Sequence, residues 1–309
     1  MVDKVTNIGA SVRDRLRNIA QQRGMDYQIA LTRYVLERLL YRLSVSKHRD
    51  AFVLKGAMLQ AIWLKNPFRH TRDLDLHARG EEDTAKVIEV FRAIFSDGDH
   101  HHDDGVVFDG KLLKAEPIRE NVFYGGIRVT TTATLGGARI PVLVDIGFGD
   151  AITPRPELAD YPALLDLPKP RLLVYPRETV IAEKFEAMVT LGLTNSRMKD
   201  FHDVAMLASQ FEFDGQLLAD ALTATFKRRS TSLPTTSPPA FSESFTKRLE
   251  TVALWKAFVT RESIQPEYSD LDAVIGLNRS FLLEPALAAA GRIAFSMRWL
   301  AGGTWSGRL

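Results

Sequence analysis

The residues best suited to chemistry are two aspartates in the stretch from Arg69 to Leu76, which reads Arg-His-Thr-Arg-Asp-Leu-Asp-Leu. Alternate side chains of a β-strand point to opposite faces, so Asp73 and Asp75 share one face while the intervening leucines face a core. Like charges side by side repel each other, and Mg²⁺ relieves that repulsion because it prefers carboxylate oxygens. The pattern alone leaves open an alternative, which is an edge strand with a solvated acidic face.

A third carboxylate lies in a later strand-like segment, Ile140 to Gly147, whose other side chains are apolar. A lone acid in a strand that looks buried on both faces costs free energy unless it is paired or bound to a metal. Asp145 is therefore a candidate third ligand. The alternative is a residue at the end of a strand that caps the following turn.

A candidate phosphate seat precedes the paired aspartates. The apolar run Phe52–Leu54 predicts a strand, and residues 58–64 look helical. Between them lies Lys55-Gly56-Ala57, a turn that leads into a helix N-terminus. Backbone N–H groups are free there, and glycine lets an anionic ligand come close. A glycine at such a position also serves in an ordinary turn.

The surrounding pattern predicts an α+β protein. N-terminal helices and a core with a mixed or antiparallel sheet are expected in residues 1–176, and an α-helical domain in 177–309. Apolar periodicity predicts helices and alternation predicts strands. The predicted helices are residues 11–23, 26–43, 81–96, 178–191, 201–209 and 214–229, followed by three in 241–300, and the strands are 106–108, 111–118, 126–133 and 139–146. Gly136-Gly137 indicates a hairpin. The proline-rich segment 147–176 is expected to be a surface connector.

Composition excludes several classes of protein. The chain has 309 residues, a net charge of +2 and no cysteine, so disulfides and thiolate metal sites are excluded and any nucleic-acid contact must come from a local patch. Neither an apolar signal segment nor a long uncharged apolar run occurs, so we expect no membrane span and a cytoplasmic location.

Two further polar segments have less specific interpretations. Arg33, Arg38, Arg42 and Lys47 lie in and just after the predicted helix 26–43, and they form either a solvated face or part of an RNA-facing surface. The loop around His100–His102 is rich in His and Asp, but consecutive residues do not easily converge on one ion. We therefore expect a mobile surface loop there.

Taken in order, these segments describe nucleotidyl transfer. A glycine turn precedes two alternating aspartates, and a third aspartate follows on a later strand; a helix with a lysine and a basic turn come last. Three carboxylates can hold two divalent ions that stabilise the attacking and leaving oxygens of an in-line displacement. Lysine and arginine can neutralise charge on the phosphates.

The chain resembles the AbiEii/AbiGii nucleotidyltransferase-like toxins, a branch of the DNA polymerase β-like nucleotidyltransferase superfamily. The resemblance covers about residues 11–210, and the C-terminal third is similar only as a generic helical domain. The segments that carry it are Tyr34–Leu43, Phe52–Ala57, Arg69–Leu76, Val144–Ile146, Ile181–Ala187 and Arg197–Asp203.

The resemblance implies a toxin of a bacterial type IV toxin–antitoxin or abortive-infection system. Such toxins transfer a nucleoside monophosphate from an NTP to an acceptor, which in some members is the 3′ end of tRNA. Mg²⁺ is the implied cofactor, with Mn²⁺ as a substitute. A cognate antitoxin is the implied partner, whether or not it binds directly, and the toxin is expected to be a monomer.

The resemblance also implies roles for individual residues. The implied metal ligands are Asp73, Asp75 and Asp145, and these together with Lys184 and Asp203 are the implied catalytic residues. The implied nucleotide-binding residues are Lys55, Gly56, Ala57, Arg69, Thr71, Lys184, Arg197 and Lys199. One departure concerns the phosphate turn, where the superfamily usually has Gly-Ser and this chain has Gly56-Ala57, so one hydroxyl donor is missing.

Alternatives remain at two levels. If Lys184 has no catalytic role, it is a lysine at the boundary of the core whose aliphatic stem covers apolar surface. If Arg197 and Lys199 do not bind nucleotide, they belong to a solvated turn. The same carboxylates would also serve a metal-dependent phosphohydrolase or nuclease. A non-catalytic module that binds RNA or a protein is the third hypothesis.

Overall fold

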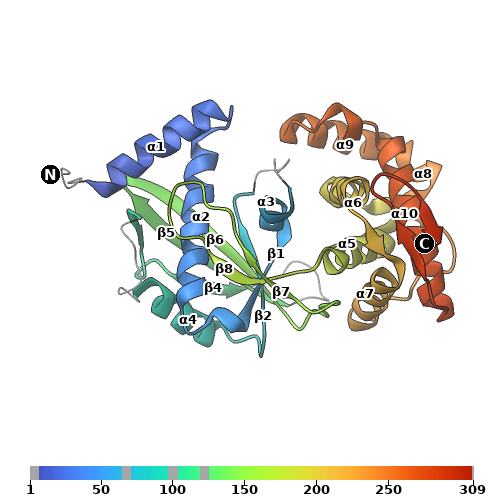
Figure 1. The fold of residues 1–309 in the computed structure, drawn as a ribbon, viewed down its shortest axis with the longest axis horizontal. Helices are drawn as coiled ribbons and strands as arrows, with labels where there is room; N and C mark the ends of the chain where they lie inside the picture. The colour runs from blue at the N-terminus through green and yellow to red at the C-terminus, as the bar shows by residue number, and fades with distance from the viewer. Residues whose placement is uncertain (1–6, 65–70, 97–103, 119–124, 308–309) are drawn as a thin grey trace. The chain divides into compact units, whose positions relative to one another are not determined.

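The computed structural model describes residues 7–64, 71–96, 104–118 and 125–307. The chain divides into two compact units, which are interleaved in the sequence (Figure 1). Unit 1 consists of residues 1–149 and 157–174, and unit 2 of residues 150–156 and 175–309. The chain therefore passes between the units at residues 149–150, 156–157 and 174–175. Helices together with a mixed sheet confirm the predicted α+β class.

Side chains cap the first two helices of unit 1 at their N-termini. Asn7 accepts a hydrogen bond from the Ala10 N–H, so the first helix begins at Ile8, before the predicted start at residue 11. Asp26, at the predicted start of the second helix, caps it, because its carboxylate accepts a hydrogen bond from the Ile29 N–H at 3.1 Å. The helices are α1 (Ile8–Gln22), α2 (Tyr27–Val45), α3 (Gln60–Trp63) and α4 (Thr84–Ser96), with 3₁₀ turns η1 (Arg49–Ala51) and η2 (Gly56–Leu59).

An eight-stranded mixed sheet forms the centre of the described part of unit 1 (Figure 1). Its strands are β1 (Phe52–Lys55), β2 (Leu74–Ala78), β3 (Val106–Phe108), β4 (Lys114–Pro117), β5 (Gly126–Leu135), β6 (Ala138–Phe148), β7 (Glu157–Asp160) and β8 (Arg171–Val174). The order is β3-β5-β6-β2-β1-β8-β7, and β4 also pairs with β5. The pairs β2–β6 and β1–β8 are parallel and the other pairs are antiparallel.

The prediction of a plain surface connector over residues 147–176 is wrong, because β7 and β8 lie within it. β8 pairs with β1 in parallel, with Val53 opposite Leu173 and Leu54 opposite Val174. The physical reason is the short run Arg171–Val174, in which Leu172 and Val174 are buried and contribute to the core. The prolines confine the strands to short lengths without excluding them.

The arginines of α2 correct a second prediction. Arg38 and Arg42 are buried, so they belong neither to a solvated face nor to an RNA-facing surface. Arg38 Nη2 donates to Glu37 at 2.8 Å and to the Pro168 carbonyl at 2.9 Å. Arg42 Nη2 donates to Asp104 at 3.3 Å and to the Val106 carbonyl at 2.6 Å. Both guanidinium groups are retained inside because they join α2 to neighbouring segments.

Unit 2 is mostly helical, with a small antiparallel sheet that the sequence did not indicate. Trp299 and Trp305 of this sheet pack on Phe281, with ring centroids 4.9 and 5.8 Å from that ring. The helices are α5 (Arg177–Leu191), α6 (Met198–Gln210), α7 (Gly215–Arg228), α8 (Glu243–Thr246), α9 (Leu249–Glu262) and α10 (Leu271–Gly291). The strands are β9 (Phe213–Asp214), β10 (Met297–Trp299) and β11 (Trp305–Gly307), and 3₁₀ turns occur at η4 (Gly192–Thr194), η5 (Pro239–Phe241) and η6 (Pro266–Tyr268).

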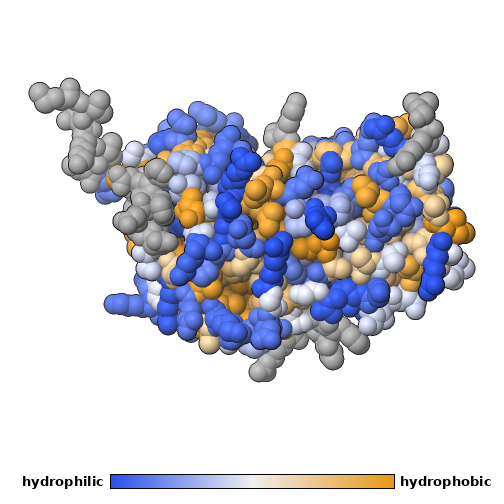
Figure 2. Space-filling view, turned by 60° about the horizontal axis from the view of Figure 1, so that its bottom comes forward, coloured by the Kyte–Doolittle hydropathy of each residue, from blue (hydrophilic) through white to orange (hydrophobic). Residues whose placement is uncertain are grey.

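Hydrophilic side chains cover much of the face drawn in Figure 2, and hydrophobic ones are interspersed in small groups. Among the helices that the structure describes, none combines the length and apolar character that crossing a membrane requires.

Candidate functional site

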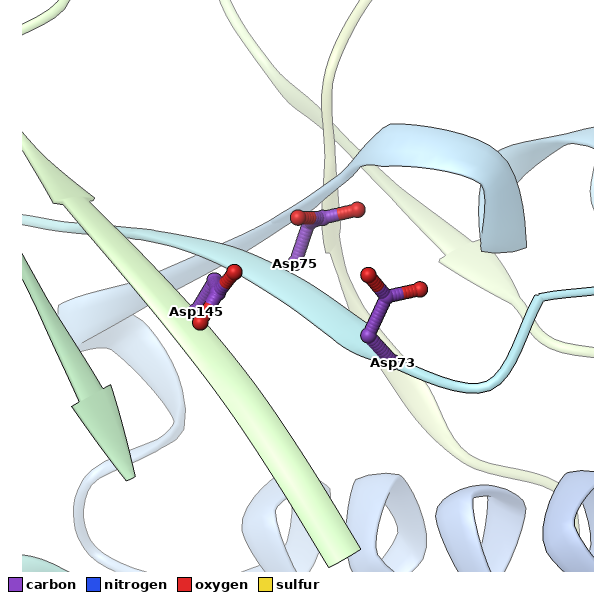
Figure 3. Close-up of side chains that lie close together, drawn as sticks. All are labelled: Asp73, Asp75 and Asp145. Carbon is purple, nitrogen blue, oxygen red and sulfur yellow. The ribbon is translucent and has the colours of Figure 1, made fainter. Parts of the chain in front are cut away.

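Three carboxylates converge in unit 1, and we call Asp73, Asp75 and Asp145 the carboxylate triad (Figure 3). Parallel pairing of β2 with β6 places Asp75 directly opposite Asp145, and Asp73 immediately precedes β2. One oxygen from each carboxylate lies within 4.8 Å of the other two. The intervening Leu74 and Leu76 are fully buried, as the alternation predicts.

The triad fits a divalent cation by its chemistry. Its donors are all hard oxygens, which suit Mg²⁺ or Mn²⁺ and not a thiophilic metal. Three half-buried carboxylates this close repel one another, and a bound cation would remove that repulsion. The Thr71 hydroxyl donates to the carboxylate of Asp73 and, at 3.2 Å, to its backbone carbonyl, and so holds this ligand in place.

Gly56 can lie close to Asp75 of the triad because it has no side chain. Its φ of +72° is in the left-handed region. A Cβ atom built on Gly56 would lie 1.9 Å from Asp75 Oδ2, so only glycine leaves room for this carboxylate. Lys55 pairs with Asp75 across the antiparallel β1–β2 ladder, and Ala57 follows in η2. The turn between strand and helix is present as predicted, while its role as a phosphate seat stays a prediction.

Arg128 is the residue of this site that we did not predict. Its Nε and Nη2 donate to the two oxygens of Asp145, each at 2.8 Å. A signal was available, because a hairpin turn fixes the register of its strands. The Gly136-Gly137 turn places Leu135 opposite Ala138, and counting back along the ladder places Arg128 opposite Asp145.

The predicted residues of the helical part meet in a separate cluster in unit 2. Lys184 Nζ of α5 donates to Asp200 Oδ1 at 2.7 Å and to Asp203 Oδ2 at 2.9 Å, both on α6. Arg197 Nε donates to Asp200 Oδ2 at 2.6 Å. Asp200, which the sequence did not single out, is buried and links the two cations. Lys199 is exposed in the first turn of α6.

The surroundings of Asp200 make the stability of unit 2 dependent on pH. Burial acts to raise its pKa, but the neighbouring Lys184 and Arg197 outweigh burial and lower the pKa below its ordinary value of 3.8. A depressed carboxyl pKa stabilises the fold above the unfolded-state pKa, and that stabilisation is lost as pH falls through the folded-state pKa.

Replacing Asp200 should therefore have an effect that depends on pH. Asp200→Asn is expected to lower the free energy of unfolding by about 2 kcal/mol at pH 7, because the charged hydrogen bonds are lost. The difference from wild type should shrink as pH falls below about 4, the unfolded-state pKa of an aspartate. Urea unfolding of both proteins at several pH values measures this, and a difference that stays constant over the range would contradict the assignment.

Two predicted segments cannot be placed. Arg69, proposed to bind nucleotide, and the His100–His102 loop both lie outside the described residues. The other predicted site residues form two groups, one in each unit. Asp73, Asp75 and Asp145 lie together in unit 1, with Lys55, Gly56, Ala57 and Thr71 in the adjoining segments, and Lys184, Arg197, Lys199 and Asp203 lie in unit 2.

Comparisons with known proteins identify the family of the chain. A model of the family described as nucleotidyl transferase AbiEii toxin, type IV TA system, matches residues 38–275. No curated protein sequence matches. Among solved structures, JHP933 from Helicobacter pylori is 13% identical with a TM-score of 0.48, and the match covers 87% of this chain and 94% of the JHP933 chain. A candidate nucleotidyltransferase from H. pylori is 13% identical with a TM-score of 0.47, and the match covers 87% of this chain and 97% of the H. pylori chain. Because the family model matches most of its length, the chain belongs to the AbiEii family of nucleotidyl transferase toxins of type IV toxin–antitoxin systems.

Proposed function

We propose that this toxin transfers a nucleoside monophosphate from an NTP to the 3′ end of an RNA, with tRNA as the acceptor and Mg²⁺ or Mn²⁺ as the cofactor. The observation that supports this most strongly is the convergence of Asp73, Asp75 and Asp145 from two parallel strands. Separate surface acids would not need a shared register, whereas ligands of a common cation would.

The residues of unit 1 would divide the work as follows. The triad would hold the divalent cations, which when bound neutralise developing charge and align the attacking and leaving oxygens. Asp145 would serve as the third ligand or as the base for the acceptor hydroxyl. Lys55 would neutralise phosphate charge beside Asp75, its partner in the ladder. The backbone N–H groups of Gly56 and Ala57 would bind phosphate oxygens, with Arg69 and Thr71 as further nucleotide contacts.

We further propose that residues 177–309 form the helical domain of the toxin and contribute Lys184 and Asp203 to the reaction. The support is that Lys184 is held in one position by two carboxylates, as a cation that acts on phosphate must be. Arg197 and Lys199 would add nucleotide contacts. The protein would act as a monomer in the cytoplasm, where NTP and tRNA are present.

Sequencing of RNA 3′ ends tests the proposal. After expression of the wild-type toxin, tRNA 3′ ends should carry added nucleotides. Asp75→Asn should remove them, because it takes one charged ligand from the triad, while the exposed Asp14→Asn should leave them unchanged. Shortened RNAs in place of extended ones would favour a nuclease, and full toxicity of Asp75→Asn would indicate a non-catalytic module.

The antitoxin is the partner that the family implies, and its action can be tested separately. Growth arrest on expression should be relieved when the cognate antitoxin is co-expressed. Co-purification would show direct binding, and relief without co-purification would show that the antitoxin opposes the effect of the toxin instead.

A further inference from the structure

Four charged residues form a continuous row across adjacent strands of the unit 1 sheet. In register, Lys55 of β1 lies opposite Asp75 of β2, Asp75 opposite Asp145 of β6, and Asp145 opposite Arg128 of β5. Residues directly opposite each other on neighbouring strands share a face. The row therefore reads positive, negative, negative, positive, with two of the triad carboxylates at its centre.

The two central carboxylates are a like-charge pair, which destabilises a sheet when its members face each other directly. The sequence supplies a cation on each outer side of the pair. On the β5 side, Arg128 Nε and Nη2 each donate a hydrogen bond of 2.8 Å to one of the two oxygens of Asp145, which makes a bidentate, forked pair. Forked pairs of this kind are the strongest ion pairs that arginine makes with a carboxylate.

The same forked pair competes with a divalent cation for the oxygens of Asp145. Both oxygens of Asp145 are occupied by guanidinium N–H groups, and one of them belongs to the set of triad oxygens within 4.8 Å of one another. A divalent cation entering the triad must compete with the positive charge of Arg128 for this carboxylate. The side chains are 38% and 20% exposed, so solvent can reach the pair and the fork can open without unfolding the sheet.

We propose that Arg128 is a counter-charge latch on the triad, a positioning residue that holds Asp145 in its ligand position and lowers the affinity for divalent cations until one displaces it. This inference rests on the proposed function in one respect, namely that the triad binds a divalent cation. The latch keeps the carboxylates from repelling one another before a cation binds, and it makes cation binding an exchange instead of a simple addition.

Manganese titration without nucleotide tests the latch. Free Mn²⁺ is measured by electron paramagnetic resonance at fixed pH and ionic strength. Arg128→Gln should bind Mn²⁺ about tenfold more tightly than wild type, the equivalent of one charge-assisted hydrogen bond. Arg128→Lys should be intermediate, because lysine keeps the charge but cannot form the fork. Arg139→Gln removes a positive charge from an exposed position on the same strand as Asp145 and should leave the affinity unchanged.

The outcomes separate the latch from the proposed function. Unchanged or weaker Mn²⁺ binding by Arg128→Gln, with wild-type binding that Asp75→Asn removes, would overturn the latch and leave the metal site standing. Absence of Mn²⁺ binding in every variant would overturn both. Circular dichroism and urea unfolding check that each variant is folded, and if Arg128→Gln does not fold, Arg128→Lys decides the question through its smaller gain in affinity.

Discussion

Gly56→Ala is expected to remove divalent-cation binding at the triad and to lower the rate of nucleotide transfer at least about 100-fold, the scale on which a misplacement of about 1 Å acts in an active site. The new Cβ would lie 1.9 Å from Asp75 Oδ2 and 2.6 Å from its Cγ, so the carboxylate must leave its position. No change of rotamer at alanine can avoid this contact. Mn²⁺ binding and a labelled-NTP transfer assay measure the two effects.

A matched control separates this contact from backbone strain. Gly137 also has a positive φ, +84°, but nothing lies within 4 Å of the Cβ position. Gly137→Ala should therefore lose some stability and keep both Mn²⁺ binding and transfer. If Gly56→Ala bound Mn²⁺ as wild type does, Asp75 would not be the ligand that we propose.

Glu37→Ala is expected to lower the free energy of unfolding by about 3–5 kcal/mol, because it leaves a buried charge without its partner. The Arg38 and Glu37 side chains are 0% exposed, and Glu37 Oε2 also accepts from the Leu164 N–H at 2.7 Å. Without Glu37, the guanidinium keeps the Pro168 carbonyl and the faces of two tyrosine rings. The midpoint of urea unfolding reports the loss.

Two comparisons make this result specific to the buried charge. Asp14→Ala removes the exposed pair with Arg17 and should change the free energy of unfolding by less than about 1 kcal/mol. Replacing both buried partners together, as Glu37→Leu with Arg38→Met, should recover part of the loss, since no uncompensated charge remains. A double variant as unstable as Glu37→Ala alone would attribute the loss to packing.

The triad is the part of the molecule that sequence reasoning reached most directly. Alternation of Asp73 and Asp75 with leucines predicts one shared face, and a carboxylate in an apolar strand predicts a partner or an ion for Asp145. The adjacency of β2 and β6 was not derivable from these local patterns, because parallel strands are joined by long connections whose course periodicity does not record. The resemblance to a known family supplied that step.

Other features could not be predicted from the sequence because tertiary packing overrides the local preferences of the residues. Arg38 and Arg42 look like surface residues in a periodic helix, and only the enclosure of α2 by neighbouring segments buries them. β8 is a short apolar run among prolines, and it is recognised as a strand only because it pairs with β1. Arg128 is a different case, since the hairpin at Gly136-Gly137 already determines that Arg128 lies opposite Asp145.

The pairing of β1 with β8 has a consequence for how the toxin is made. β1 ends at Lys55 and β8 at Val174, so ribosomes elongating at 5–20 residues per second take about 6–24 s to supply the second edge. During that time β1 has no neighbour on one side, and its exposed N–H and C=O groups can pair with other chains. The triad residues all precede residue 174, so the nascent chain carries the carboxylates before the sheet that aligns them is complete.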